Sequence, residues 1–402
     1  TWVSAWCGLS PRTPRTRHST SAIKPVSTPS SAAKSSKARR SRLLLTESEY
    51  LSAGAPLYGG ALQMISLAMS NPFLSICIPT FNRSPYLCKT LDAIVSEPLF
   101  QETDEIEIIV SDNASTDDTP SLMSRFCSTY PGKIRYLRLT EPIDSHFNFQ
   151  NALDHGRGEY LKLLNDTVMF RPGMLKQLCD EIRKHPDGDV FLTNRIPGCS
   201  LPEKRITAVC DAVSICSFYI TWIASYTYRK RLYRSFPDPF RYFALYFPQE
   251  DIYFRALVNG GISYLLNKEF FETQRAVYKI AQRNEAEIFG DCYLRFLSIY
   301  GDVGAIPYSV LKKEKYDVLM LHTIPVYFDF SKIYFGGKTL GWLAFLRSCP
   351  LYHKEFYFWC AFIAAWFYKL ARMLPGINFL AQKSKDLFEY LIKSKKRTSE
   401  QL

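Results

Sequence analysis

The sequence predicts an α/β fold, with a mostly parallel β-sheet flanked by helices and a helical C-terminal extension. Two observations lead to this prediction. Short apolar runs alternate with segments of helical periodicity, which is typical of βαβ units and a parallel sheet. Polar residues directly follow the apolar runs, as expected where ligands bind beyond the carboxyl ends of parallel strands. The predicted strands are residues 74–79, 106–111, 134–138, 160–164 and 189–193.

Helices are predicted between and after these strands. Ser84 as N-cap and Pro85 at the first helical position predict the first helix. Ser115, with Asp118 three residues later, resembles a capping box and predicts a second helix beginning at Ser115. The acids Asp117 and Asp118 are interpreted as stabilising that helix start through the helix dipole. Further helices are predicted over residues 146–155, 172–184, 252–258, 285–300 and 309–320.

Composition divides the chain into three parts. Residues 1–68 are rich in Ser, Thr, Pro, Lys and Arg and bury too little apolar surface to offset chain entropy, so we expect them to be disordered. Because Met69 resembles a natural start, this segment is interpreted as a non-native leader, with a transit peptide as the second interpretation. Residues 69–330 form the predicted catalytic domain, and residues 331–402 form an aromatic, basic and helical C-terminal region.

Charge and cysteine content exclude several classes of protein. The net charge is +12, but residues 1–70 and 338–402 each carry +7, so the middle of the chain is slightly acidic. A nucleic-acid-binding domain would carry its basic surface on the folded core, so this distribution argues against one. The eleven cysteines show no CxxC pair and no zinc spacing, which indicates reduced thiols in a cytosolic protein.

Four polar clusters follow predicted strands, and each also has an ordinary structural interpretation. Residues 79–83 (PTFNR) and 111–117 (SDNASTD) are either ligand-binding loops or plain strand-to-helix turns. Asp166 ends a strand, where its carboxylate suits a divalent cation that prefers oxygen ligands. Glu250 and Asp251 open a helix, where they supply either a general base or simple dipole stabilisation.

The order of these clusters makes them specific. The segments LSICIPTFNR, IEIIVSDNASTDDT, GRGEYLKLLND and PQEDIYFRALVNGG together resemble the family 2 glycosyltransferases, which have the Rossmann-like GT-A fold. The resemblance covers about residues 74–266. It implies an inverting transfer of a sugar from a nucleoside-diphosphate donor to a hydroxyl acceptor. The implied donor-nucleotide residues are Pro79, Thr80, Asn82, Arg83, Asp112 and Asn113; the implied metal ligand is Asp166, and the implied catalytic residues are Asp251, as base, with Glu250.

The metal motif departs from the family pattern. The family has two or three acids here and binds Mg²⁺ or Mn²⁺, whereas this chain has Asn165, Asp166 and Thr167. Metal binding could therefore be weaker, use the Asn165 or Thr167 oxygens, or be absent, with cations such as Arg83 stabilising the leaving diphosphate. A catalytically impaired domain that binds nucleotide sugars or acts as a scaffold is the alternative. A sugar nucleotidyltransferase is disfavoured, because it would have a Gly-rich loop in place of residues 79–86.

The C-terminal region predicts contact with a membrane surface. Residues 356–368 (FYFWCAFIAAWFY) form a thirteen-residue apolar run, shorter than the roughly twenty residues of a spanning helix. Lysines and arginines flank it, as in helices that lie in the interface of anionic membranes; a core helix is the other interpretation. The resemblance implies a glycan or lipid-linked acceptor, as in bacterial polysaccharide or lipopolysaccharide synthesis, and a peripheral location on the cytoplasmic face of the inner membrane.

Overall fold

The structure is a computed structural model that describes residues 71–196, 199–274, 284–325 and 342–373. The predicted disorder of residues 1–68 and the predicted domain boundary at residue 330 lie outside these residues. All ten cysteines in the described ranges are free thiols, and four of them are buried.

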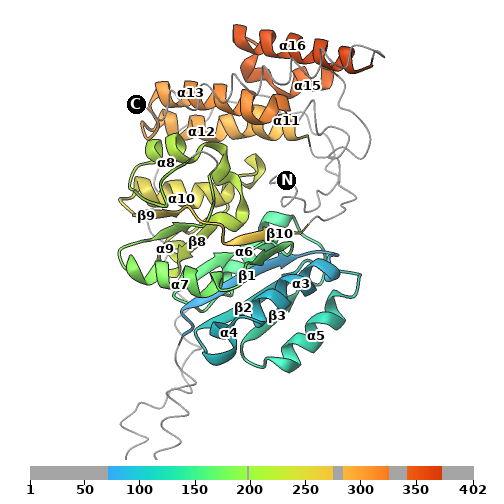
Figure 1. Ribbon diagram of the computed structural model, residues 1–402, viewed down its shortest axis with the longest axis vertical. Coiled ribbons are helices and arrows are strands. Elements are labelled where there is room, and N and C mark those ends of the chain that lie inside the picture. The colour runs from blue at the N-terminus through green and yellow to red at the C-terminus, as the bar shows by residue number, and fades with distance from the viewer. Residues whose placement is uncertain (1–70, 197–198, 275–283, 326–341, 374–402) are drawn as a thin grey trace, which may run out of the picture. The chain divides into compact units, whose positions relative to one another are not determined.

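An eight-stranded sheet with the order β3-β2-β1-β4-β8-β6-β9-β7 organises the domain (Figure 1). A second, two-stranded sheet pairs β10 with β5. The strands of the large sheet are β1 (Leu74–Thr80), β2 (Ile106–Asp112), β3 (Ile134–Arg138), β4 (Tyr160–Leu163), β6 (Val190–Leu192), β7 (Glu203–Ile206), β8 (Tyr226–Arg229) and β9 (Ser263–Leu266). The small sheet consists of β5 (Val168–Phe170) and β10 (Phe271–Thr273).

Six of the eight strands run in the same direction. The pairs β1–β2, β1–β4, β2–β3 and β6–β9 are parallel. Strand β8 is antiparallel to both β4 and β6, so those two run the same way, and β7 is antiparallel to β9. The carboxyl ends of β1, β2, β4, β6 and β9 therefore meet at one edge of the sheet, which we call the carboxyl edge.

Helices cover both faces of the sheet because side chains alternate along each buried strand. On β1, Ile76 and Ile78 join one apolar core and Cys77 joins the other. Helices α3, α4, α5 and α7 contribute to the first core, and α6, α8 and α10 to the second. The helices of this domain are α3 (Ser84–Val95), α4 (Pro98–Glu102), α5 (Thr119–Thr129), α6 (Ser145–Asp154), α7 (Met174–Lys184), α8 (Val209–Cys216), α9 (Lys230–Ser235) and α10 (Pro248–Val258).

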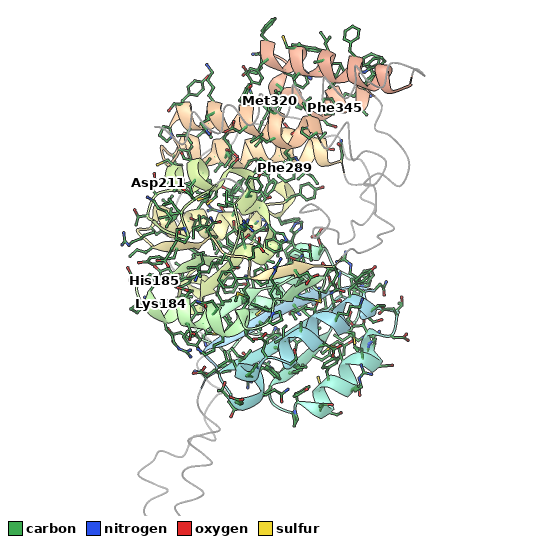
Figure 2. All side chains as sticks on the ribbon, in the orientation of Figure 1. Lys184, His185, Asp211, Phe289, Met320 and Phe345 are labelled. Carbon is green, nitrogen blue, oxygen red and sulfur yellow. The ribbon has the colours of Figure 1, made fainter. Side chains whose placement is uncertain are left out.

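The C-terminal helices extend the second core. Phe247 at the start of α10 packs edge-on against Tyr293, with ring centroids 5.2 Å apart. Phe289, Met320 and Phe345 belong to the same apolar layer (Figure 2). These helices are α11 (Glu285–Glu287), which continues through a π-helical turn (Ile288–Cys292) into α12 (Tyr293–Asp302), then α13 (Tyr308–Val318), α15 (Trp342–Ser348) and α16 (Phe356–Met373). No helix among the described residues is both long and apolar enough to cross a membrane.

The predicted α/β class and all five predicted strands are confirmed. Three predicted helix starts are wrong. Helix α5 begins at Thr119, not Ser115, and α10 begins at Pro248, four residues before the predicted Ile252. The N-cap of α3 is Arg83, so Ser84 is the first helical residue and not the cap. The Ser115 N–H donates to Asp112 Oδ1 (2.9 Å), and Ala114 adopts a left-handed backbone conformation (φ 59°), so residues 113–118 form a loop. Five strands were not predicted from the sequence, because they are three or four residues long and lack a readable alternation: β5, β7, β8, β9 and β10.

Candidate active site

Asp166 lies at the carboxyl edge and is held from three sides. Its side chain is almost fully buried, and the Thr80 hydroxyl at the end of β1 donates to Oδ2 (2.8 Å). Arg83 Nη1 pairs with Oδ1 at 3.0 Å, and the Thr90 hydroxyl of α3 donates to the Asp166 carbonyl (2.9 Å). Three of the predicted site residues, Thr80, Arg83 and Asp166, therefore form one contact group.

Asp112 ends β2 directly beside Thr80, its register partner on β1. The carboxylate is fully buried; Oδ1 accepts from the Ser115 N–H, and Oδ2 accepts from the Tyr136 hydroxyl (2.5 Å), with Arg138 Nε at 3.7 Å. Burial, and next the hydrogen bond to Asp112, raise the pKa of Tyr136. The strand register thus brings the second predicted carboxylate to the same edge as the first.

Three polar side chains link the loops of this edge. Asn82, at φ 52°, adopts the left-handed conformation that asparagine tolerates better than most residues, and its Oδ1 accepts from the Thr116 N–H (2.7 Å). Asn113 exchanges two hydrogen bonds of 2.8 Å with the main chain of Ile143. Asp117 accepts from the Ser84 N–H (2.9 Å) and from Thr119, so it links the starts of α3 and α5, consistent with the predicted capping role.

Asp251 lies in the first turn of α10 and has no exposed surface. Arg241 donates to both oxygens (3.1 Å each), Arg255 Nε lies 2.9 Å from Oδ2, and the Tyr300 hydroxyl of α12 donates to Oδ1 (2.6 Å). The carboxylate is therefore surrounded by two guanidinium groups and a phenol. Sequence analysis identified the acid but none of these three partners.

Glu250 is the immediate neighbour of Asp251, yet its surroundings differ. It is fully buried near Tyr226, Tyr228 and Tyr293. Apart from its own main-chain N–H, neither carboxyl oxygen has a hydrogen-bond partner in the part of the chain that the structure describes. Burial raises the pKa of Glu250 well above its ordinary value. The two predicted catalytic acids are thus one charge-paired carboxylate and one carboxyl group in an apolar environment.

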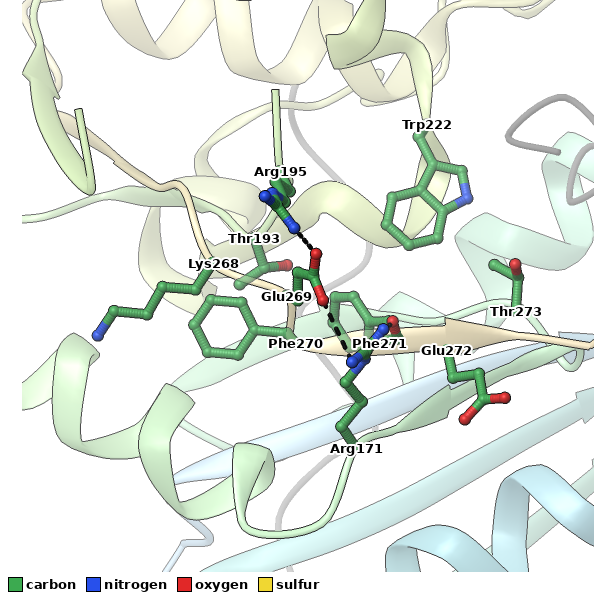
Figure 3. Close-up of a pocket in the computed structure, with 10 residues that line it drawn as sticks. All are labelled: Arg171, Thr193, Arg195, Trp222, Lys268, Glu269, Phe270, Phe271, Glu272 and Thr273. Atoms are coloured by element: carbon green, nitrogen blue, oxygen red, sulfur yellow. Dashed lines mark hydrogen bonds and ion pairs between the residues drawn. The ribbon is translucent and has the colours of Figure 1, made fainter. Parts of the chain in front are cut away.

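A pocket of about 240 Å³ opens near the ends of β6 and β9 (Figure 3). Aromatic rings of Trp222, Phe270 and Phe271 line it, and Glu269 bridges Arg171 (3.2 Å) and Arg195 across it. Beneath it, the buried Lys162 ammonium lies 4.8 Å from the Phe271 ring centroid and donates to the Thr193 hydroxyl (2.7 Å). Burial lowers the pKa of Lys162 well below its ordinary value. The lining of the pocket combines aromatic surface with charged groups, a combination that suits a sugar.

The residues around Asp166 do not fit a metal cage as they stand. Both carboxylate oxygens already accept hydrogen bonds, one of them from the cationic Arg83. A Mg²⁺ or Mn²⁺ ion wants several oxygen ligands and would have to displace Arg83 or Thr80. One other group in the described ranges, Glu181, His185 and Glu203, has ligand types at metal spacing. Glu181 already accepts from Lys268 (2.5 Å) and Lys184 (3.1 Å), so ammonium groups compensate its charge.

The sequence model of the family described as Glycosyl transferase family 2 matches residues 75–249. Residues 75–249 are a family 2 glycosyltransferase domain. The match begins in β1, includes Asp112 and Asp166 and ends at Gln249, in the first turn of α10. The predicted family is confirmed, and with it the GT-A class of the fold.

Three curated relatives are similar to about a third of the chain. An uncharacterised protein of Mycobacterium bovis is 31% identical over 29% of this chain and 33% of its own length. Abequosyltransferase RfbV of Salmonella typhimurium is 31% identical over 33% of this chain and 39% of its own length. GalNAc(5)-diNAcBac-PP-undecaprenol beta-1,3-glucosyltransferase of Campylobacter jejuni is 34% identical over 27% of this chain and 33% of its own length. The chain therefore spans about a third of the length of these relatives.

Among solved structures, the S. aureus TarS fragment 1-349 in complex with UDP aligns with 81% of this chain and 91% of its own. The sequence identity is 16% and the TM-score is 0.46.

Proposed function

We propose that this chain is an inverting glycosyltransferase that moves a sugar from a nucleoside-diphosphate donor to a hydroxyl acceptor. One observation carries the proposal: the family 2 domain gathers Thr80, Arg83, Asp112 and Asp166 at one sheet edge through direct contacts and strand register. Ligands of parallel α/β sheets bind at this edge. The first turn of α10 brings Glu250 and Asp251 to the same end of the domain, since α10 leads into the amino end of β9.

On the donor side, the proposed nucleotide contacts are Pro79, Thr80, Asn82, Arg83, Asp112 and Asn113. Asp112 lies next to Thr80 in the strand register, so a base or ribose hydroxyl that hydrogen-bonds to Asp112 would direct its diphosphate toward Arg83 and Asp166. A guanidinium group suits two phosphate oxygens at once. We therefore assign Arg83 to the stabilisation of the leaving diphosphate, the electrostatic contribution that is usually the largest in such sites. Asn82 and Asn113 would in addition hold the loops of the site in place through their hydrogen bonds to the main chain.

For proton transfer, Asp251 is the proposed base, because the resemblance in the segment PQEDIYFRALVNGG implies the family's catalytic acid at this position. Its contacts with Arg255 and Tyr300 fix the carboxylate, and Arg241, whose side chain is 34% exposed, is the partner best able to leave when an acceptor hydroxyl arrives. Glu250 is the second candidate, since its oxygens are not engaged by other side chains in the described ranges. Asp251 would take the proton as the acceptor oxygen attacks the anomeric carbon and the nucleoside diphosphate departs.

The acceptor is proposed to be a glycan, free or lipid-linked, of bacterial surface-polysaccharide synthesis at the cytoplasmic face of the membrane. Two relatives support this: one is named an abequosyltransferase and the other a glucosyltransferase acting on an undecaprenol-linked saccharide. The pocket of Figure 3 is the proposed site for a sugar of the acceptor. There, Trp222→Ala should raise the acceptor KM and leave the rate of donor hydrolysis unchanged. A general folding defect would instead lower the rates of both transfer and donor hydrolysis.

A panel of nucleotide sugars tests the whole proposal. Hydrolysis or transfer is measured with Mg²⁺, Mn²⁺ or a chelator for the wild type, Asp166→Ala, Asp251→Asn and Glu250→Gln. We expect losses on the order of a hundredfold or more for Asp166→Ala and Asp251→Asn, with nucleotide binding retained by Asp251→Asn. Glu250→Gln should stay within about tenfold; the reverse ranking would make Glu250 the base.

The same assay decides metal dependence and the alternative function. Loss of activity in chelator with recovery in Mn²⁺ would show that the reaction needs a divalent ion, which at Asp166 would have to displace Arg83 or Thr80. Activity unaffected by both Asp166→Ala and Asp251→Asn would overturn the mechanism. Tight nucleotide binding without turnover of any donor would favour the impaired, scaffold-type domain, which the reduced metal motif and the occupied Asp166 oxygens would explain.

A further inference from the structure

Helix α16 exposes large apolar side chains along one face. Phe356, Trp359, Ile363 and Phe367 recur at helical spacing and are 83%, 38%, 51% and 68% exposed. The opposite side of the same helix is used for packing, since Phe358 and Phe362 stack on Phe345 of α15 with centroids 6.3 and 5.9 Å away. The helix is therefore already anchored to the protein on one side, while its other side remains exposed.

A hollow of about 420 Å³ deepens this face between α15 and α16. Its lining residues among the described ranges are all apolar, namely Trp342, Phe362, Ile363, Trp366 and Phe367. We call the exposed residues of α15 and α16 together with this hollow the apolar face. Contiguous apolar surface of this kind, rich in Trp and Phe, marks an interaction site and is uncommon on monomeric proteins without a partner.

The charge around the apolar face selects the kind of partner. Arg347 in the last turn of α15 and Lys354 just before α16 are exposed, and residues 338–402 carry a net charge of +7. Association of two copies through this face would bring two such regions together, which like-charge repulsion opposes. An anionic lipid surface instead accepts both features: cations attract its headgroups, and Trp and Phe enter the boundary between headgroups and acyl chains.

The helix also has the length of an interfacial segment. Its apolar run is thirteen residues, against about twenty for a span, and Lys369 and Arg372 follow within the same helix. We propose that the apolar face of α15 and α16 docks on the headgroup layer of an anionic bilayer, with α16 lying in the membrane plane. This inference goes beyond the proposed transfer reaction and does not depend on it.

The apolar face connects to the catalytic acids through packed helices. Tyr357 of α16 meets Tyr316 of α13 at 5.1 Å between ring centroids, and Lys315 of α13 pairs with Glu355 at 2.6 Å. Glu314 of α13 accepts from Tyr293 of α12 (3.2 Å), and Tyr300 of α12 donates to Asp251. Docking would therefore hold the active-site end of α10 in a fixed relation to the lipid surface.

Vesicle flotation of the full chain tests the proposal without any activity measurement. The probes are vesicles of phosphatidylcholine alone and of phosphatidylcholine with phosphatidylglycerol. The wild type should float with the anionic vesicles, and high salt should weaken binding. The variant with Phe356→Ser, Ile363→Ser and Phe367→Ser should bind these vesicles at least about tenfold more weakly than the wild type, because the apolar contribution is lost.

A control variant replaces three other exposed apolar residues that lie outside α15 and α16. Leu201→Ser, Val258→Ser and Val303→Ser alter side chains that are 44%, 53% and 68% exposed, far from α16 in the sequence, and should leave vesicle binding unchanged. Quenching of tryptophan fluorescence by brominated lipid should accompany wild-type binding. Failure of the wild type to bind anionic vesicles, or equal binding by the α16 triple variant, would overturn the proposal. Concentration-dependent dimers that disappear in this variant would instead identify a second copy as the occupant.

Discussion

Buried carboxyl groups have different surroundings in two regions of the molecule. At the carboxyl edge, Asp112 and Asp166 accept hydrogen bonds on both oxygens and lie beside arginine side chains. Toward the C-terminal helices, Glu250 and Glu314 are buried among tyrosines, and burial raises the pKa of both. The first arrangement stabilises a negative charge, whereas the second favours the neutral acid. Position in a motif therefore does not decide how an acid behaves; the partners that reach it do.

Asp251 lies at the junction of these two regions and follows the first pattern. Replacing it with Asn removes the negative charge between Arg241 and Arg255 and leaves Arg255, 11% exposed, without its closest counter-charge. Loss of one partner of a buried ion pair destabilises by about 3–5 kcal/mol. We expect Asp251→Asn to lower the free energy of unfolding by about 3 kcal/mol, measured by urea denaturation near neutral pH.

The matched control for this change is Asp238→Asn. Asp238 also pairs with Arg255, at 3.0 Å, but its own side chain is 56% exposed. Exposed pairs contribute little, so this variant should lose less than about 1 kcal/mol. Equal losses in the two variants would show that burial of Asp251 is not what makes its pairing matter.

Glu314 provides a test of the second arrangement, in which burial favours the neutral carboxyl group. Its carboxyl accepts from Ser217 (2.9 Å) and Tyr293 (3.2 Å), but burial raises its pKa from 4.5 to about 8. Because the folded pKa lies above the unfolded one, the native state binds more protons between these values, so stability falls as pH rises from about 4.5 to 8 and then levels off. Glu314→Gln removes this titration, keeps a hydrogen-bond acceptor and should be more stable than the wild type at alkaline pH.

The measurement is urea denaturation at acidic, neutral and alkaline pH. The stability of Glu314→Gln relative to the wild type should increase by a few kcal/mol across the titration range. Glu102→Gln, at an exposed position at the end of α4, is the control and should show no such trend. A difference between Glu314→Gln and the wild type that does not change with pH would contradict the neutral state of this acid.

The sequence allowed more of the first region to be predicted than of the second. Thr80, Arg83, Asp112 and Asp166 follow strands whose apolar runs and parallel order are readable, so their meeting at one edge follows from strand register. The exact contacts were not predictable: nothing local indicates that Arg83 occupies the carboxylate proposed for a metal. Helix α5 was predicted four residues too early, because Ser115 bonds to Asp112 and not to its own helix.

The second region depends on contacts between residues far apart in the sequence. Tyr300 reaches Asp251 across 49 positions, and Ser217 reaches Glu314 across 97. Helical periodicity predicted α12 and α13 well, but periodicity states only which face is apolar, not which polar tip meets which acid. Strand β8, which reverses direction between β4 and β6, was also missed, so the sheet was expected to be more uniformly parallel than it is.

The smallest expected effect concerns the link between the two regions. Tyr300→Phe removes the hydroxyl that donates to Asp251 Oδ1 at 2.6 Å, while the ring remains packed edge-on against Phe254 at 5.0 Å. Since Arg241 and Arg255 still satisfy the carboxylate, the loss of one hydrogen bond to a charged group should lower the free energy of unfolding by about 1.5 kcal/mol. Tyr308→Phe, at an 80% exposed position, is the matched control and should change nothing. If Tyr300→Phe were as damaging as Asp251→Asn, the phenol would be the principal partner of this acid, and the C-terminal helices would determine its state more than the two arginines do.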